Sequence, residues 1–342
     1  MVKKKVSIKD IAREVGVSTT TISFIINGKD KENSISKSLV KKVHEKIKEL
    51  GYQPNHFAKN LRSGKTKIIG LMVEDISNSF FANIAKEIED LAYKSGYRIV
   101  YCSTDNDTKK AKEFLSMFKT MGTDGCIIAP TMGIEDDIKD LIDGGVKVVL
   151  FDRAFKNKNV DTVLVDDEGG IYDGVQHLIK NGYKNIGLVA TAFGDPEKEG
   201  RIIGYNDAMK ENGLESRVFP LNFTSDRKTY VTIIKDILKE NPDFDALVFS
   251  TNYLAVCGIE AISNLDISIP GKIAVLAFDE NDFFRIHKPS ITSIAQPRKA
   301  IAQKTINLLL SRLQNEEKGI TTNITLATEL IVRDSSPSVK KK

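Results

Sequence analysis

A run of hydroxyl side chains from Ser18 to Thr21, with Ser23 just beyond it, lies near the start of the chain. Hydroxyl groups can form hydrogen bonds with base edges or with phosphates of nucleic acid. The net charge of +4 is unevenly spread, because residues 1–67 carry 16 Lys/Arg and 6 Asp/Glu while the remainder carries 34 and 40. A basic segment with such a run predicts contact with a polyanion, and the alternative is a charged face that meets only solvent.

Three short helical patterns position these hydroxyl groups. The first follows a capping serine, Ser7, and ends at Gly16, and the second runs over 19–27. Ser36 caps the third, which ends at Gly51. Two short helices joined by a glycine turn are typical of a helix-turn-helix. Any small three-helix bundle would have the same pattern, but the charge and the hydroxyl run favour DNA binding.

The next segment, from Tyr52 to Gly64, is a candidate linker. Pro54 suits a first helical turn, and Ala58 and Leu61 lie on one helical face. About ten residues are too few for a stable isolated helix. The segment is therefore predicted to become helical only when something holds it.

From Lys67 onward, apolar strand patterns alternate with amphipathic helical patterns. Ten segments are predicted to be strands, the first at 68–73 and the last at 291–295. This alternation predicts parallel sheets covered by helices, and ten strands favour two sheets over one. Ligands in such folds bind beyond the carboxyl ends of the strands.

Enzyme, metal and membrane functions are not favoured by the sequence. It has no G-x-x-x-x-G-K, no G-x-S-x-G, and no G-x-G-x-x-G after the first strand, so we expect no enzyme and no cofactor. The acidic run at 166–168 is interpreted as a helix start. An apolar run of about 18 residues is missing, as is a secretory signal, which predicts a cytoplasmic protein without a membrane span. Neither the histidines nor the cysteines have metal-ligand spacing, and the cysteines are expected to be buried thiols: His44, His56, His177, His287, Cys102, Cys126 and Cys257.

Several segments match the motifs of one protein family in order along nearly the whole chain. In the head they are Ser7–Ser18, Thr21–Ser23, Asn27–Gly28, Leu50–Asn55 and Ala58–Arg62. In the body they are Ile69–Leu71, Asp75–Phe81, Asp124–Ile128, Phe151–Arg153, Gly204–Tyr205, Ala277–Asp279, Gln296–Pro297 and Glu329–Asp334. With these segments the chain resembles the lactose-repressor (LacI/GalR) family of bacterial transcription regulators.

The resemblance implies an N-terminal all-α helix-turn-helix headpiece and an α/β two-lobed effector domain like the type I periplasmic binding proteins. The headpiece would span 1–52, the hinge helix or linker 53–66, and the two-lobed domain 67–334. Lobe 1 would comprise about 67–160 and 293–322, and lobe 2 about 161–290 and 325–333. A basic tail, 335–342, would follow.

The resemblance also implies the DNA contacts, with the second helix in the major groove and paired hinge helices in the minor groove. Family members often have a long polar or basic residue where this chain has Phe24, so the usual operator is in doubt. Phe24 is expected either to contact bases or to pack against the third helix or the partner lobe. Leu61 would wedge into a base step and kink the duplex. The implied DNA-binding residues are Ser7, Ser18, Thr19, Thr20, Thr21, Ser23, Phe24, Asn27, Lys29, Asn55, Ala58, Leu61 and Arg62.

An effector site in the cleft between the lobes is implied by matched positions. Arg201 and Asp279 would form a charged pair that clamps ligand hydroxyl groups. Aromatic stacking would come from Phe81 or Phe223, because the chain has no tryptophan. The remaining candidates are Asn78, Asp152, Arg153, Asn252 and Gln296.

The function expected from these features is a sequence-specific DNA-binding transcription regulator, and more narrowly a repressor. Its partners would be double-stranded operator DNA and a small effector, a sugar or sugar derivative, with a purine or a sugar phosphate as the alternative. The tail after Arg333 has no leucine heptads, which favours a homodimer over a tetramer. A sugar-binding transport protein or a structural DNA-bending protein would share only the body or only the head.

Overall fold

The computed structural model describes residues 6–52, 65–155, 159–191, 199–224, 226–314 and 320–339. The chain separates into two compact units, Met1–Thr66 and Lys67–Lys342. The first unit is a helical headpiece, and the second is a two-lobed α/β body. This is the fold class that the sequence predicts.

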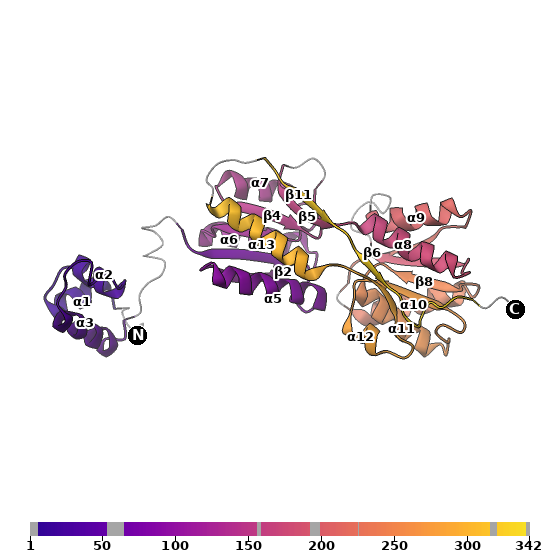
Figure 1. Cartoon of the computed structure of the whole chain (residues 1–342), viewed down its shortest axis with the longest axis horizontal. Helices are drawn as coiled ribbons and strands as arrows, with labels where there is room; N and C mark the ends of the chain where they lie inside the picture. The colour runs from indigo at the N-terminus through magenta and orange to yellow at the C-terminus, as the bar shows by residue number, and fades with distance from the viewer. Residues whose placement is uncertain are drawn as a thin grey trace. The chain divides into compact units, whose positions relative to one another are not determined.

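The headpiece consists of α1 (Ile8–Val15), α2 (Thr19–Ile26) and α3 (Lys37–Glu49), shown at the indigo end of the chain in Figure 1. Each helix begins after a serine whose side chain accepts a hydrogen bond from the backbone N–H three residues later, and these are Ser7, Ser18 and Ser36. Gly16 ends α1 with φ at 79°, a left-handed conformation that glycine adopts without strain. The three helix starts are therefore where the capping pattern predicts them.

A small apolar core holds the three helices together. Ile11 and Ile22 are fully buried, and Val43 of α3 packs in the same cluster with Ala12 and Val15. Helices of 8 to 13 residues are marginal alone, so this tertiary packing is what stabilises them.

Two six-stranded sheets form the body (Figure 1). The first has the order β11-β5-β4-β3-β1-β2 and is parallel throughout. Its strands are β1 (Ile68–Val73), β2 (Arg98–Ser103), β3 (Gly125–Ile128), β4 (Lys147–Phe151), β5 (Asp161–Val165) and β11 (Asn323–Leu326). The second has the equivalent order β12-β10-β9-β8-β6-β7, with only β12 antiparallel. Its strands are β6 (Ile186–Thr191), β7 (Arg217–Leu221), β8 (Ala246–Phe249), β9 (Ala274–Phe278), β10 (Thr292–Ala295) and β12 (Glu329–Ile331).

Helices cover both faces of each sheet, so each lobe has two apolar cores. On the first sheet, α5 (Ser79–Lys94) and α13 (Arg298–Gln314) pack on one face, and α6 (Thr108–Met121) and α7 (Glu135–Asp143) pack on the other. On the second, α10 (Arg227–Glu240) and α11 (Asn252–Asn264) oppose α8 (Asp167–Lys180) and α9 (Gly200–Glu211). The short α12 (Asp282–Ile286) follows β9. Strands buried on both faces have nearly continuous apolar runs, which explains why the sequence identifies them well.

The lobe boundaries differ from those expected. The strand β5 (161–165) pairs with β4 in the first sheet, although the sequence placed it in lobe 2. Conversely, β10 belongs to the second sheet, and β11 belongs to the first. The crossings therefore come after these strands, and lobe 1 comprises 67–165 and 298–326 while lobe 2 comprises 166–295 and 329–339. An apolar run marks a strand but does not say which sheet the strand joins.

The expected basic tail is also partly wrong. Ser335 and Ser336 are fully buried in lobe 2. The Ser335 hydroxyl donates to the Val275 carbonyl at 2.6 Å, and Asn181 Nδ2 donates to the Ser336 carbonyl at 2.8 Å. Residues 335–339 are thus part of lobe 2, because they form hydrogen bonds with Val275 of β9 and with Asn181 at the end of α8.

Candidate functional site

The carboxyl ends of strands from both sheets meet around one cavity of about 70 Å³, which is partly open to solvent. In lobe 1, Glu74 follows β1 and Asp152 follows β4. In lobe 2, Ser250 follows β8 and Asp279 follows β9. Two neighbouring cavities, of about 600 and 240 Å³, each have some lining residues in common with it. The cavity therefore lies where this architecture places ligands.

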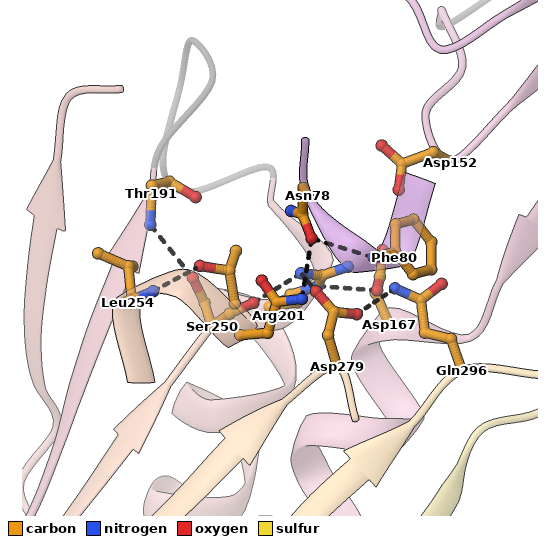
Figure 2. Close-up of polar contacts among 12 residues, drawn as sticks. Asn78, Phe80, Asp152, Asp167, Thr191, Arg201, Ser250, Leu254, Asp279 and Gln296 are labelled. Atoms are coloured by element: carbon orange, nitrogen blue, oxygen red, sulfur yellow. Dashed lines mark hydrogen bonds and ion pairs between the residues drawn. The ribbon is translucent and has the colours of Figure 1, made fainter. Parts of the chain in front are cut away.

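Arg201 is the centre of the polar network on the lobe 2 side (Figure 2). Its Nε donates to Asp167 Oδ1 at 2.9 Å, and its NH1 donates to the Ser250 carbonyl at 2.6 Å. NH1 also lies 3.9 Å from Asp279 Oδ2, and the guanidinium lies 3.9 Å from the centroid of the Phe278 ring. The expected pair of Arg201 and Asp279 is present, but the shorter contact of Arg201 is with Asp167.

Two glycines bring Asp167 and Arg201 together. Each residue lies in the first turn of its helix, Asp167 in α8 and Arg201 in α9. A Cβ at Gly204 would lie 2.1 Å from the carbonyl oxygen of Glu168, and one at Gly200 would lie 3.3 Å from Asp167 Cβ. The approach at Gly204 is open only to a residue without a side chain, and Gly200 adds a tight contact, so these glycines position the ion pair.

The lobe 1 side has a second buried ion pair. Arg153 NH2 donates to Glu74 Oε2 at 2.5 Å, and NH1 donates to Asn106 Oδ1 at 2.8 Å. Arg153 Nε also lies 3.5 Å from Asp152 Oδ2. Both arginines that line the cavity are therefore already engaged by carboxylates.

Asp152 and Asp279 occupy equivalent places in the two lobes. Each directly follows a phenylalanine that ends a central strand, and each has a left-handed backbone, with φ at 66° and 70°. Burial raises the pKa of Asp152 to about 7, although Arg153 and Arg201 oppose the shift. Burial also raises the pKa of Asp279, against Arg201 and the hydrogen bond from Gln296. Left-handed backbone at two aligned carboxylates turns both side chains toward the cleft.

Burial acts to lower the pKa of Arg201, but the neighbouring carboxylates outweigh this effect. Desolvation alone would lower its pKa, yet the carboxylates of Asp167, Asp279 and Asp152 raise the pKa of Arg201 overall. The guanidinium thus stays charged in the cavity, which is the state that can clamp hydroxyl oxygens.

The two lobes also touch directly through amide side chains. Asn252 Nδ2 donates to Asn78 Oδ1 at 3.0 Å, and Asn281 Nδ2 donates to Ser79 Oγ at 3.3 Å. Asn78 Oδ1 also accepts from the backbone of Phe80 as the cap of α5. Figure 2 shows Asn78 directed from lobe 1 toward the lobe 2 residues. These contacts join the two lobes beside the cavity, which Asn78 itself lines.

Aromatic rings form part of the cavity wall. Phe80 and Phe81 lie edge to face, with centroids 5.0 Å apart, and both line the cavity from lobe 1. Tyr253 lines it from lobe 2, and its hydroxyl is buried without a hydrogen-bond partner among the described residues. Phe223 lies against Tyr253, in the neighbouring 240 Å³ cavity.

The structure brings most of the expected effector residues together. Six of them line the central cavity, namely Asn78, Phe81, Asp152, Arg153, Arg201 and Asp279. Asn252 and Gln296 do not line it but hold residues that do, since Gln296 Nε2 donates to Asp279 Oδ1 at 2.5 Å. Sequence reasoning missed the lining residues Glu74, Asp167, Thr191, Ser250 and Tyr253. Their position directly after predicted strands, or at the start of the following helix, is the signal that would have found them.

The candidate DNA-binding residues in the headpiece differ in their exposure and in their hydrogen bonds within the protein. Thr19, Thr20 and Lys29 are exposed. Ser7 and Ser18 are exposed but already cap α1 and α2, and Ser18 Oγ lies 2.9 Å from Thr21 Oγ1. The remaining residues are Thr21, Ser23 and Phe24, which are half-buried, and Asn27, whose side chain donates to the Ser23 carbonyl at 2.7 Å.

The expected hinge contacts lie outside the described residues. They are Asn55, Ala58, Leu61 and Arg62. Among the residues that the structure does describe, no helix is long and apolar enough to cross a membrane. Within the same residues, no group of three or more metal-binding side chains is found.

Comparison with known proteins matches each unit to a family model, and the whole chain to a regulator. Residues 7–55 match the model of bacterial regulatory proteins of the lacI family, and residues 175–336 match a periplasmic binding protein-like domain. The HTH-type transcriptional regulator RegA of Clostridium saccharobutylicum is 34% identical, over 96% of this chain and 99% of that protein.

Solved structures give the same result for the fold. A LacI family regulator from Enterococcus faecium with bound ribose is 27% identical and has a TM-score of 0.72 over 80% of this chain and all of that one. The lac repressor dimer bound to operator and an anti-inducer is 20% identical, with a TM-score of 0.80 over 98% of this chain and all of that one. The second likeness shows the fold alone.

Proposed function

This chain belongs to the LacI family of bacterial regulatory proteins and is a DNA-binding transcription regulator, and we propose that it is a repressor controlled by an uncharged sugar-like effector. The observation that carries the proposal is the buried Arg201 between Asp167 and Asp279 at the edge of the cavity. This arrangement offers a fixed donor group and two acceptor groups within one small space. Sugar hydroxyls both donate and accept, so they match it well.

The charge of the cavity supports a neutral ligand over a sugar phosphate. Among the residues that the structure describes, five carboxylates line it against two arginines, namely Glu74, Asp152, Asp167, Glu199, Asp279, Arg153 and Arg201. Both arginines already contact carboxylates, so a phosphate group would enter a site with excess negative charge.

A purine is also less well matched than a sugar. Carboxylates accept hydrogen bonds and donate none when ionised, so a ligand for this cavity needs many donor groups. A monosaccharide has one donor at each hydroxyl group, whereas a purine has few. The relative from Enterococcus faecium was solved with bound ribose, which supports a sugar over a purine.

On the DNA side, we propose that α2 enters the major groove and that two copies of the chain read a near-palindromic operator. Thr19 and Thr20 are exposed at the start of α2. The N–H groups at the starts of α2 and α3 favour nearby phosphates. A homodimer places two such headpieces on one duplex, which is how short helix-turn-helix modules obtain specificity.

Control would pass from the cleft to the DNA through the angle between the lobes. Three chain segments join the lobes, and Asn252–Asn78 and Asn281–Ser79 contacts connect their facing edges. A ligand that contacts Asp152 in lobe 1 and Asp279 in lobe 2 would favour one lobe angle over another. Lobe 1 directly follows the linker, so its movement would change the spacing of the two headpieces in a dimer.

The experiment combines operator selection with ligand screening. Duplexes bound by the full-length protein are selected from a random pool, and neutral sugars, sugar phosphates and purines are screened by thermal shift. Operator affinity is then measured by fluorescence anisotropy with each stabilising compound. We expect a neutral sugar to stabilise the protein and to weaken operator binding. The proposal fails if selection returns no preferred sequence, or if only a phosphorylated ligand or a purine changes operator binding.

A further inference from the structure

The second helix of the headpiece has no charged side chain to read bases with. From residue 15 to residue 28 the chain contains no Lys, Arg, Asp or Glu. The commonest specific contact in the major groove, an arginine or lysine on the O6 and N7 atoms of guanine, is therefore unavailable to α2. Base reading by this helix must rely on hydroxyl, amide or aromatic groups.

Phe24 lies on the outer face of α2. Ile22 and Ile25 are buried in the headpiece core, at 0% and 2% exposure. With about 3.6 residues per turn, Thr20 and Phe24 lie on the face opposite these two isoleucines. Phe24 is only half-buried, and it is not among the described side chains that pack against the six buried residues of this core. The part of the Phe24 ring that stays exposed therefore lies on the face of α2 that points away from this core.

The ring of Phe24 and the methyl group of Thr20 form an apolar strip on this face. Residues four apart in a helix are neighbours, so the two groups adjoin each other. Thr19 and Asn27 place polar groups at the ends of the same exposed region. The region thus combines hydrogen-bonding groups with a partly exposed apolar group.

From this arrangement we infer that Phe24 is a specificity-determining residue that reads thymine through its C5-methyl group. The inference rests on the proposed function, because it requires α2 to enter the major groove. A phenyl ring forms no hydrogen bond with a base edge, and the thymine methyl is the apolar group that the major groove presents. The operator half-site should therefore contain a thymine at the position that residue 24 faces.

The test replaces thymine with deoxyuracil, which removes only the methyl group, at each position of the selected operator. Wild-type protein should lose about fourfold in affinity at one thymine per half-site, which is the factor that burial of one methyl group contributes. Replacing that thymine in both half-sites should give about fifteenfold, if the two sites act independently. Phe24→Ala should remove the discrimination at this position and leave it unchanged at any other thymine.

Two further variants separate base reading from folding. Phe24→Leu retains an apolar side chain and should retain part of the discrimination, while Phe24→Arg should shift the selected base toward guanine. The thermal unfolding of each variant is measured alongside. The inference is overturned if no thymine shows the methyl effect, or if Phe24→Ala and Phe24→Leu keep the wild-type effect. If wild type selects no operator at all, the proposed function fails together with it.

Discussion

The exposed residues of the headpiece and the residues that line the cleft satisfy their polar groups in opposite ways. In the headpiece, Thr19 and Thr20 are exposed to solvent. In the cleft, Arg201 and Asp279 are largely buried and joined to Asp167 and Gln296. One surface keeps its polar groups hydrated until DNA arrives, and the other holds them in a fixed network.

The difference follows from the cost of burying charge. An exposed hydroxyl needs no partner in the protein, so the headpiece surface can vary without loss of fold. A buried guanidinium or carboxylate must be paired, and removal of one partner leaves the other uncompensated. The cleft residues should therefore affect stability and ligand response together, while exposed headpiece residues that cap no helix, such as Thr19 and Thr20, should affect DNA binding alone.

The largest expected effect is that of Arg201→Leu. This change leaves Asp167 and Asp279 without their cation, and loss of one partner of a buried pair costs about 3–5 kcal/mol. Arg217→Leu is the matched control, because Arg217 pairs with the exposed carboxylates of Asp243 and Glu215 and should cost about 1 kcal/mol or less. Urea unfolding of the full chain measures both. Equal costs for the two variants would remove the contrast between cleft and surface.

A smaller effect is expected from pH through Asp152. Because burial raises its pKa to about 7, the folded protein keeps this proton at pH values where the unfolded chain has released it. The free energy of unfolding should therefore fall as pH rises from about 4, the ordinary pKa of aspartate, and should level off above about 7. Asp152→Asn should flatten this dependence, and asparagine tolerates the left-handed backbone there. The measurement is the urea midpoint of wild type and of Asp152→Asn across this pH range. Identical pH profiles for the two proteins would contradict the role of Asp152.

The headpiece should show a smaller effect still, at its capping hydroxyl. Ser18 Oγ accepts from the backbone N–H of Thr21 at 3.1 Å. Ser18→Ala removes this cap and should lower the stability of the headpiece by about 1 kcal/mol. Ser18→Asp, which can still cap, should restore most of it. A full loss of stability in both variants would show that the cap is not the cause.

The smallest effect on stability is expected for Thr20→Ala. The side chain is exposed on α2, so the change in stability should stay within about 0.5 kcal/mol. Operator affinity should nevertheless fall, because the hydroxyl and methyl groups face outward. If Thr20→Ala unfolded more easily but bound the operator as wild type does, Thr20 would behave as a structural residue and not as a DNA contact.

The headpiece was predictable from sequence because its signals are local. Ser7, Ser18 and Ser36 each cap a helix at the predicted position, and Gly16 ends the first helix. The strands of the body were also predictable, since burial on both faces makes them apolar throughout. The sequence alone does not decide whether Phe24 contacts bases or packs against protein. Its place on α2, opposite the buried Ile22 and Ile25, favours base contact.

The rest depended on pairings between distant segments. The assignment of β5, β10 and β11 to their sheets is set by strand neighbours that the sequence does not mark. Asp167 was interpreted as a helix start, which it is, but its contact with Arg201 arises from the close approach of α8 and α9 at Gly204. Ser335 and Ser336 lie in a segment whose composition predicts a solvated tail, and they are buried because lobe 2 offers them the Val275 carbonyl and the Asn181 side chain as partners.

The most direct test of the account is the operator affinity of wild type and Asp279→Asn, each measured with and without the sugar found by screening. Asparagine keeps the shape of the side chain and an acceptor for Gln296, but it removes the charge beside Arg201. For wild type, the operator affinities with and without the sugar should differ by roughly 5–150-fold, the usual range of coupling between two sites. The ratio should be near one for Asp279→Asn at the same sugar concentration. A variant that responds as strongly as wild type would contradict the assignment of this cavity as the effector site.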